Sequence, residues 1–327
     1  MTLAPRAVLV HRTTEYEELL ARHGTHGQAA FFLSSRDRDI REVAERHHRT
    51  HQALTEVAAA VPHRWRQSRV ERADLDRFLF GPEDVVVVVG QDGLVANAAK
   101  YLSGQPVVGI DTDPGRNPGV LVRHRAADAG KLLAEAAGGR GGVDELTMVE
   151  AVADDSQRLL ALNEICLGPA GHQTIRYRLT AGNRPASLKA GVRAKTKAAP
   201  GAKVGLGTKP GTEPGAEAQA SSGVLVGTGT GATGWLRSLW QERASALALP
   251  GPADRRLLWF VREAWPSPTT GTSLVSGELT PTERLTLTVE SDRLIAFGDG
   301  MESDALTLTW GQTVRVGVSG TTLRLLG

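Results

Sequence analysis

The first 142 residues alternate between short apolar runs and segments with helical spacing of apolar residues. Apolar runs at residues 7–10, 28–34, 85–89 and 106–110 predict strands, and the five consecutive valines at 85–89 are typical of a strand buried on both faces. Residues 14–17 have a capping-box pattern that opens a helix, and residues 38–61 predict a long helix that stops at Pro62. This order favours an open α/β sheet with right-handed crossovers.

After about Gly142 the pattern changes to many short strands. We predict a hairpin turn at residues 154–156 and one helix near residues 236–247. The predicted strands lie at residues 146–152, 159–166, 175–179, 223–227, 259–261, 285–289, 306–308 and 314–318. We therefore expect two domains: an α/β domain over residues 1–142 and a β-rich domain over residues 143–327.

Residues 184–220 interrupt the second half with a segment rich in Ala, Gly, Pro, Lys and Thr. Five of the seven lysines in the chain lie between Lys189 and Lys209. A segment with so few large apolar residues buries too little surface to offset its chain entropy, so we expect a disordered insertion. A basic lid over an anionic ligand is the less favoured alternative.

Composition then narrows the class of protein. The chain has 327 residues, 41% of them hydrophobic and 23% charged, as in a soluble globular protein. A formal charge of +2 argues against a dedicated nucleic-acid binder. We expect no membrane partner, because no run is long and apolar enough to span a bilayer. The single cysteine, Cys166, excludes an intrachain disulfide. A cytoplasmic enzyme with a small-molecule partner is expected.

The first candidate site is the turn Gly90-Gln91-Asp92-Gly93, directly after the valine strand. Glycines allow a phosphate to approach the backbone, and the N-terminus of the following helix, which carries Asn97, points free N–H groups at an anion. An aspartate between the glycines suits a general base that takes a hydroxyl proton during phosphoryl transfer. The alternative is a turn aspartate that caps the helix.

The second candidate site is the run Thr228-Gly229-Thr230-Gly231-Ala232-Thr233-Gly234-Trp235. It follows a predicted strand and precedes a helix, and its glycines and hydroxyls suit a polyphosphate. Trp235 either stacks on a ligand ring or fills the core. The pair Asn163-Glu164 interrupts an apolar strand, so these side chains either need polar partners, such as ribose hydroxyls, or belong to an edge strand.

Three further groups of polar residues carry weaker signals. The loop at residues 109–119 contains Asp113 and Arg116 and is a candidate binding loop. Asp299 and Glu302 form either a hairpin turn or a second acidic site. His47 and His51 are four residues apart on one helical face, as in a metal pair. Without a third ligand in view, a solvated helix face is favoured there, and the metal content stays unknown.

Taken in order, these segments resemble the NAD kinase family. The turn at Asp92 is similar to that family's Gly-Gly-Asp-Gly motif, and Asn163-Glu164 to its Asn-Glu motif. The run ending at Trp235 is similar to its Gly- and Thr-rich stretch. The branch that includes the mitochondrial enzymes also has similar versions of residues 13–17, 112–116 and 221–223.

The resemblance implies an α/β domain and a β-rich domain with the active site between them. It implies that Asp92 is the base for a ribose 2′-hydroxyl of NAD, that ATP with Mg²⁺ is the donor, and that the protein is a homodimer or higher homo-oligomer. Asn163 and Glu164 would hold a ribose, and residues 228–233 the phosphates or base, beside Trp235. Departures at Gln91, Leu94 and Ser222 leave two alternatives open: a kinase for another nucleotide, sugar or lipid hydroxyl, or a non-catalytic nucleotide sensor.

Overall fold

The computed structural model describes residues 4–116, 119–139, 141–171, 173–182 and 215–327. Its N-terminal part is an α/β sheet whose four strands are parallel, as the sequence predicted. In spatial order these strands are β2 (Arg66–Glu71), β1 (Arg6–His11), β3 (Asp84–Gly90) and β4 (Pro106–Asp111).

Helices cover both faces of this sheet. Val85, Val87 and Val89 of β3 pack with α3 (Ile40–Ala60) and α5 (Ala129–Gly138), while Val86 and Val88 pack with α4 (Asp92–Ala99). The valine strand is therefore buried on both faces because consecutive side chains point to opposite layers. Short 3₁₀ turns lie at Arg72–Arg77 and Ala126–Asp128.

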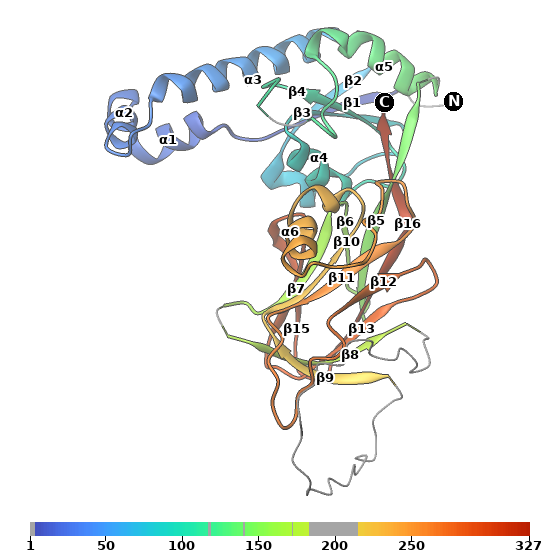
Figure 1. The fold of residues 1–327 in the computed structure, drawn as a ribbon. Helices are drawn as coiled ribbons and strands as arrows, with labels where there is room; N and C mark the ends of the chain where they lie inside the picture. Colours follow the sequence, from blue (N-terminus) through green and yellow to red (C-terminus); the bar gives the residue numbers. More distant parts are fainter. Residues whose placement is uncertain (1–3, 117–118, 140, 172, 183–214) are drawn as a thin grey trace, which may run out of the picture.

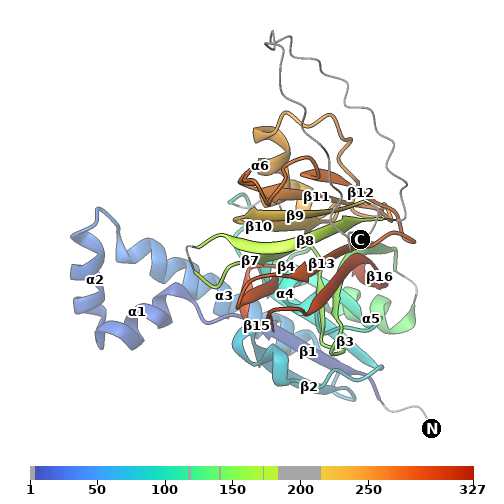
Figure 2. The ribbon, with the colours of Figure 1, turned by 90° about the horizontal axis from the view of Figure 1, so that it is seen from below.

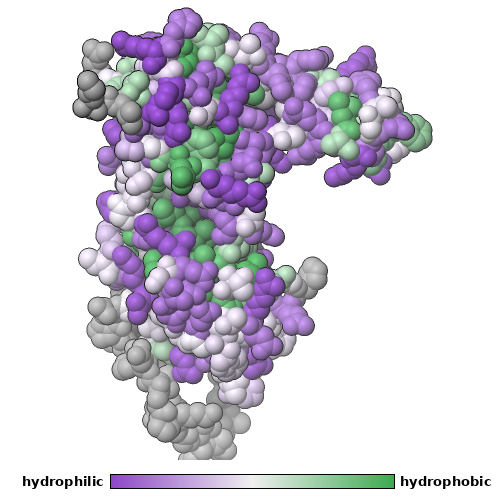
Figure 3. Space-filling view, turned by 180° about the vertical axis from the view of Figure 1, so that it is seen from behind, coloured by the Kyte–Doolittle hydropathy of each residue, from purple (hydrophilic) through white to green (hydrophobic). Residues whose placement is uncertain are grey.

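The helices α1 (Glu15–His23) and α2 (His26–Ser34) project from the body together with the first part of α3, as Figures 1 and 2 show. We call α1, α2 and this first part of α3 the arm. Its core consists of Leu19, Ala29, Leu33, Ile40 and Val43. Figure 3 shows that the arm's surface is mostly hydrophilic, with some apolar surface at its outer end.

The strand predicted at residues 28–34 is wrong, because this segment is α2. The Thr25 side chain accepts a hydrogen bond from the Gln28 N–H and so caps the helix start. Ala29 and Leu33 are buried in the arm core. They are four residues apart, and that helical spacing is hidden in the sequence by the apolar neighbours Ala30, Phe31 and Phe32.

The second half is β-rich, as predicted, and consists of two sheets packed face to face. The first sheet continues from β4 through strands β16 (Thr313–Leu326), β13 (Leu285–Val289), β8 (Ile175–Ala181) and β9 (Ala216–Ser221), while β5 (Val143–Ala153) pairs with β16 and with β6 (Arg158–Ala161). The second sheet has the order β12 (Ser276–Leu279), β11 (Leu257–Arg262), β10 (Gly223–Gly227), β7 (Glu164–Gly168), β14 (Leu294–Gly298) and β15 (Met301–Leu308).

Side chains from both sheets share one core, in which Leu179 and Leu287 belong to the first sheet and Val226 and Trp259 to the second. Helix α6 (Trp235–Glu242), preceded by the 3₁₀ turn Gly231–Thr233, covers the outer face of the second sheet through Leu236 and Leu239. The hairpin predicted at residues 154–156 is present between β5 and β6.

Three predicted boundaries in this half need correction. The strand predicted at 159–166 is two strands, β6 and β7, because the Leu162 and Asn163 N–H groups donate to the Asp299 carboxylate instead of a neighbouring strand. The helix predicted at 236–247 ends at Glu242, and Ala244 has a positive φ of 45°. Residues 216–220, predicted as disordered, belong to β9, which pairs with β8. Most of the predicted insertion, residues 184–214, lies outside the described residues.

The C-terminal strand β16 connects the two halves. It pairs antiparallel with β5 over most of its length; on its other side its first part pairs antiparallel with β13 and its end pairs in parallel with β4. Leu325 packs on the α4 side of the sheet and Leu326 on the α3 and α5 side. One sheet therefore runs from the α/β layer into the β-rich layer (Figure 1).

Candidate active site

The Gly90-Gln91-Asp92-Gly93 turn lies where β3 passes into α4, at the carboxyl end of the parallel sheet. Gln91 is the N-cap residue of α4, but its side chain makes no capping hydrogen bond. Asp92 is the first residue of the helix and not its N-cap, so the alternative that it serves as the capping aspartate is not supported. Because N–H groups of a first helical turn have no acceptor within the helix, this end can receive an anion.

The Asp92 carboxylate instead holds the loop that follows β4. Oδ1 accepts from the N–H groups of Leu121 at 2.8 Å and Val122 at 2.9 Å, and Oδ2 accepts from Val120 at 3.0 Å. A carboxylate offers about four acceptor positions, so one position on Oδ2 remains for a further hydrogen bond. The loop comes this close because Gly109 has no side chain: a Cβ there would lie 2.1 Å from the Leu121 carbonyl oxygen.

Asn163 and Glu164 lie opposite this loop, at the break between β6 and β7. The break is held by Asp299, whose carboxylate accepts from the Leu162 N–H at 2.8 Å and the Asn163 N–H at 2.7 Å. Asp299 and Gly300 have φ values of 53° and 67° and form the tight turn between β14 and β15. Asp299 is thus a hairpin-turn residue that also positions the Asn163-Glu164 pair.

Two of these carboxyl groups have raised pKa values. Burial, together with the negative charge of Asp299, raises the pKa of Glu164 to about 7. Burial raises the pKa of Asp299 to about 6, against the opposing effect of its backbone hydrogen bonds. With a pKa of about 7, the Glu164 carboxyl group is partly protonated near neutral pH, and its protonated form can both donate to and accept from a ligand hydroxyl.

The Gly- and Thr-rich run forms the third side of the site. Thr228 is fully buried, and its hydroxyl donates to the Leu162 carbonyl oxygen at 2.6 Å, which ties this run to the β6–β7 break. A Cβ on Gly231 would lie 2.4 Å from the Asn163 carbonyl oxygen and 2.9 Å from Glu164 Oε2. A Cβ on Gly229 would lie 1.9 Å from the Gly251 carbonyl oxygen. These two glycines therefore serve close chain packing.

Thr230 has a different environment from Thr228. It is 3% exposed, and its Oγ1 atom is buried with no hydrogen-bond partner among the described residues. A buried hydroxyl without a partner costs free energy, on the order of 1–3 kcal/mol, that a ligand group could recover. Thr230 is therefore the strongest sign that the space beside it receives a polar ligand.

A cavity of about 120 Å³ lies between these three segments. This is below the few hundred Å³ typical of a whole drug-sized ligand, so in this form the cavity has room for no more than about one sugar or phosphate group. Its lining residues are Asp92, Gly93, Val120, Leu121, Asn163, Glu164, Thr230, Gly231, Thr233, Gly234 and Trp235. Trp235 lies at its edge, with the Arg262 guanidinium 5.2 Å from its ring centroid.

Several other predicted site residues do not line this cavity. Gln91 is exposed, and Gly90 packs on Leu94. Asn97 bridges two other groups: its Oδ1 accepts from Arg72 Nε at 2.6 Å and its Nδ2 donates to the Asp299 carbonyl oxygen at 2.8 Å. Asp113 pairs with Arg49 at 2.8 Å, and Arg116 and Glu302 are exposed.

The N–H groups of Val120, Leu121 and Val122 were missed by sequence reasoning. They act through the backbone, so their residue types carry no signal. The one hint was Gly119, which has a φ of 63° and turns the chain toward Asp92.

Comparison with known proteins identifies the fold. No family model matches the sequence, and no curated protein matches it. Among solved structures, the chain is similar to yeast NADH kinase in its complex with NADH, with a TM-score of 0.54 and 13% sequence identity. The match covers 99% of this chain and 84% of that one. The chain therefore has the two-domain fold of that kinase. Among the described residues, no helix is long and apolar enough to cross a membrane.

Proposed function

We propose that this protein is a phosphotransferase that phosphorylates a ribose hydroxyl of NAD or NADH, with ATP as donor. The observation that carries the proposal is the cavity in which Asp92, Glu164 and the unpartnered hydroxyl of Thr230 meet. The fold shared with yeast NADH kinase supports the same class of reaction.

The residues present are compatible with ATP and Mg²⁺. The start of α4 has no side-chain cap that would compete with a phosphate, and Gly93 has no atom within 4 Å of the position of a Cβ, so a phosphate can approach the backbone there. Mg²⁺ bound with ATP would neutralise charge on the transferred phosphoryl group. Asn163 and Glu164 would hold the ribose, and Thr230 would bind one of its hydroxyls or a phosphate oxygen.

In this mechanism Asp92 takes the proton of the attacking hydroxyl at the remaining acceptor position on Oδ2. The three N–H groups of the 120–122 loop fix the plane of the carboxylate, so the base is oriented before substrate binds. Phosphoryl transfer depends mainly on positioning and charge neutralisation, and one oriented base is the chemical group the protein must supply.

The test is an assay of the tag-free protein with Mg-ATP and either NAD or NADH, beside Asp92→Asn. We expect the substitution to lower kcat by about 10²–10⁴-fold while the dissociation constant for NAD changes little. Asp74→Asn, the same change at an exposed position in the 3₁₀ turn Arg72–Arg77, is the control and should keep full activity.

The split between rate and binding is needed because Asp92 also anchors a loop. If Asp92→Asn lowers the melting temperature and NAD affinity in step with the rate, Asp92 is an anchor and not the base. A wild type that binds NAD or ATP but transfers no phosphate to any acceptor would instead make the protein a nucleotide sensor. Transfer to a sugar or lipid hydroxyl, and none to NAD or NADH, would reject NAD as the acceptor.

A further inference from the structure

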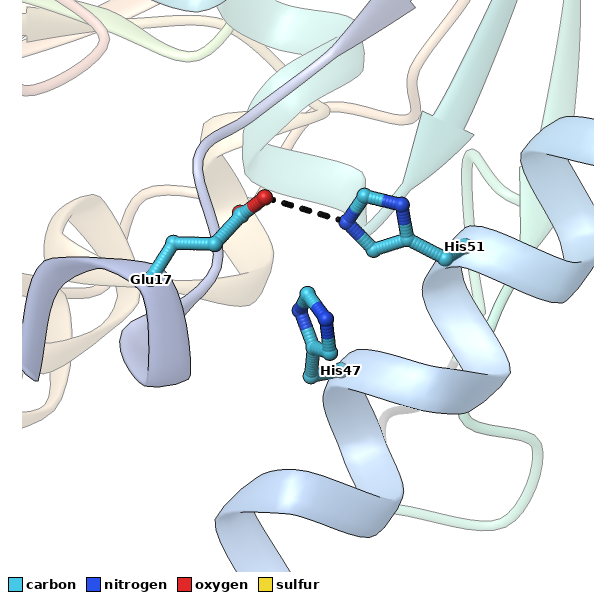
Figure 4. Close-up of side chains that lie close together, drawn as sticks. All are labelled: Glu17, His47 and His51. Atoms are coloured by element: carbon cyan, nitrogen blue, oxygen red, sulfur yellow. Dashed lines mark hydrogen bonds and ion pairs between the residues drawn. The ribbon is translucent and has the colours of Figure 1, made fainter. Parts of the chain in front are cut away.

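A second cluster of side chains lies on the arm. Glu17 on α1 and His47 and His51 on α3 each direct one potential ligand atom into a common space, and these atoms lie within 4.8 Å of one another. Figure 4 shows the three side chains converging from the two helices, with the two histidines one helical turn apart. Sequence spacing alone identified no third ligand for the histidine pair, and the fold supplies one, Glu17, from 30 residues before His47.

Neighbouring contacts hold two of these side chains in place. Thr14 Oγ1 donates to Glu17 Oε2 at 2.9 Å, and it also lies 2.8 Å from His47 Nδ1. Because the hydroxyl proton is directed to Glu17, the hydroxyl accepts from Nδ1–H of His47, which leaves the lone pair on Nε2. Metal-binding histidines commonly have such an outer hydrogen bond, which fixes the tautomer and the ring orientation.

A direct contact joins the other two side chains of the cluster. His51 Nε2 lies 3.1 Å from Glu17 Oε1. A protonated Nε2 donates to this carboxylate, and that proton leaves when an ion binds between the two atoms.

We propose that Glu17, His47 and His51 form a binding site for a divalent transition metal, Zn²⁺ being the ion that this ligand set fits best. Two imidazoles and one carboxylate favour Zn²⁺ over Mg²⁺, which prefers oxygen ligands alone. The ion would join α1 to α3 and so stabilise an arm whose own core has five buried residues among those described. The site is separate from the Asp92 cavity and does not depend on the proposed kinase activity.

The test is calorimetric titration of tag-free, chelator-treated full-length protein with ZnCl₂. We expect one Zn²⁺ per chain and a higher melting temperature of the zinc-loaded protein. His51→Ala removes one ligand and should weaken binding at least about tenfold, and Thr14→Val, which removes the outer hydrogen bond, about 10–100-fold. Co²⁺ should give the visible absorption of a low-coordinate nitrogen and oxygen site, which His51→Ala abolishes.

His48→Ala is the matched control, because His48 is an exposed histidine on the same helix and is not part of the cluster. It should bind Zn²⁺ as the wild type does. Since the His51 side chain is 49% exposed, His51→Ala should fold normally, and circular dichroism of the metal-free variant checks this. The proposal is overturned if no saturable binding occurs, if His48→Ala weakens binding as much as His51→Ala, or if Mg²⁺ competes equally with Zn²⁺.

Discussion

Asp92 and Glu164 are both acidic, but their surroundings give them different properties. Asp92 accepts three backbone N–H groups and is therefore fixed in direction. Burial and the Asp299 charge instead raise the pKa of Glu164 to about 7. One carboxylate is thus oriented for accepting a proton, while the other changes its charge near neutral pH, a separation of roles common in acid–base sites.

The raised pKa of Glu164 predicts a pH dependence of stability. In the unfolded chain Glu164 titrates near 4.5, whereas in the folded protein it titrates near 7. Between these values the folded state binds one more proton, so the free energy of unfolding contributed by this group falls as pH rises through the window. Glu164→Gln should remove this contribution to the pH dependence of stability. Between about pH 5 and 7, the melting temperature of the variant should therefore fall less than that of the wild type.

Melting curves at several pH values on both proteins give the measurement. Glu150→Gln, the same change at a β5 residue that does not line the cavity, is the control and should follow the wild type. Equal slopes for wild type and Glu164→Gln would mean that folding does not raise the pKa of Glu164.

At the scale of elements, α4 is attached to the β14–β15 hairpin at several points. Lys100 Nζ, on a side chain only 2% exposed, lies 2.7 Å from Asp304 Oδ2, and the Tyr101 hydroxyl donates to the same carboxylate at 2.6 Å. Asn97 donates to the Asp299 carbonyl oxygen of the hairpin. Since α4 carries Asp92 and the hairpin carries Asp299, these contacts set the distance between the two walls of the cavity.

We therefore expect Asp304→Ala to be strongly destabilising. It removes the carboxylate that pairs directly with the buried Lys100 ammonium, and removing one partner of a buried pair commonly costs about 3–5 kcal/mol. Glu302→Ala, an exposed change on the same strand, should alter the free energy of unfolding by no more than about 0.5 kcal/mol. Urea unfolding of the three proteins measures this, and equal stability of Asp304→Ala and wild type would show that α4 is held by apolar packing alone.

Local signals explain which elements could be predicted. The consecutive valines and the glycine turn were enough to predict the β3–turn–α4 unit. Two polar residues in an apolar run were enough to single out Asn163 and Glu164. In contrast, α2 was mistaken for a strand because its apolar run has no visible period. The pairing of Asp299 with Asn163, 136 residues away, and the meeting of Glu17 with His51 depend on tertiary structure, and no local pattern encodes them.

At the scale of the whole molecule, β16 makes the stability of one half depend on the other. Leu325 is fully buried on the α4 face and Leu326 is 1% exposed on the α3 and α5 face, so two consecutive residues close two cores. The same strand pairs with β13 and β5 of the β-rich half. Weakening the packing of the last residues of β16 should therefore lower the stability of both layers.

Leu325→Ala and Leu326→Ala each leave a cavity and should lower the free energy of unfolding by about 2–5 kcal/mol. Hydrogen exchange measured by mass spectrometry should show faster exchange in β3 of the α/β layer and also in β13 of the β-rich layer, because both strands belong to the same sheet as β16. Thr321→Ala, a half-buried change on the same strand, should leave both rates near those of the wild type. Faster exchange confined to β3 would mean that the two halves unfold independently despite their shared sheet.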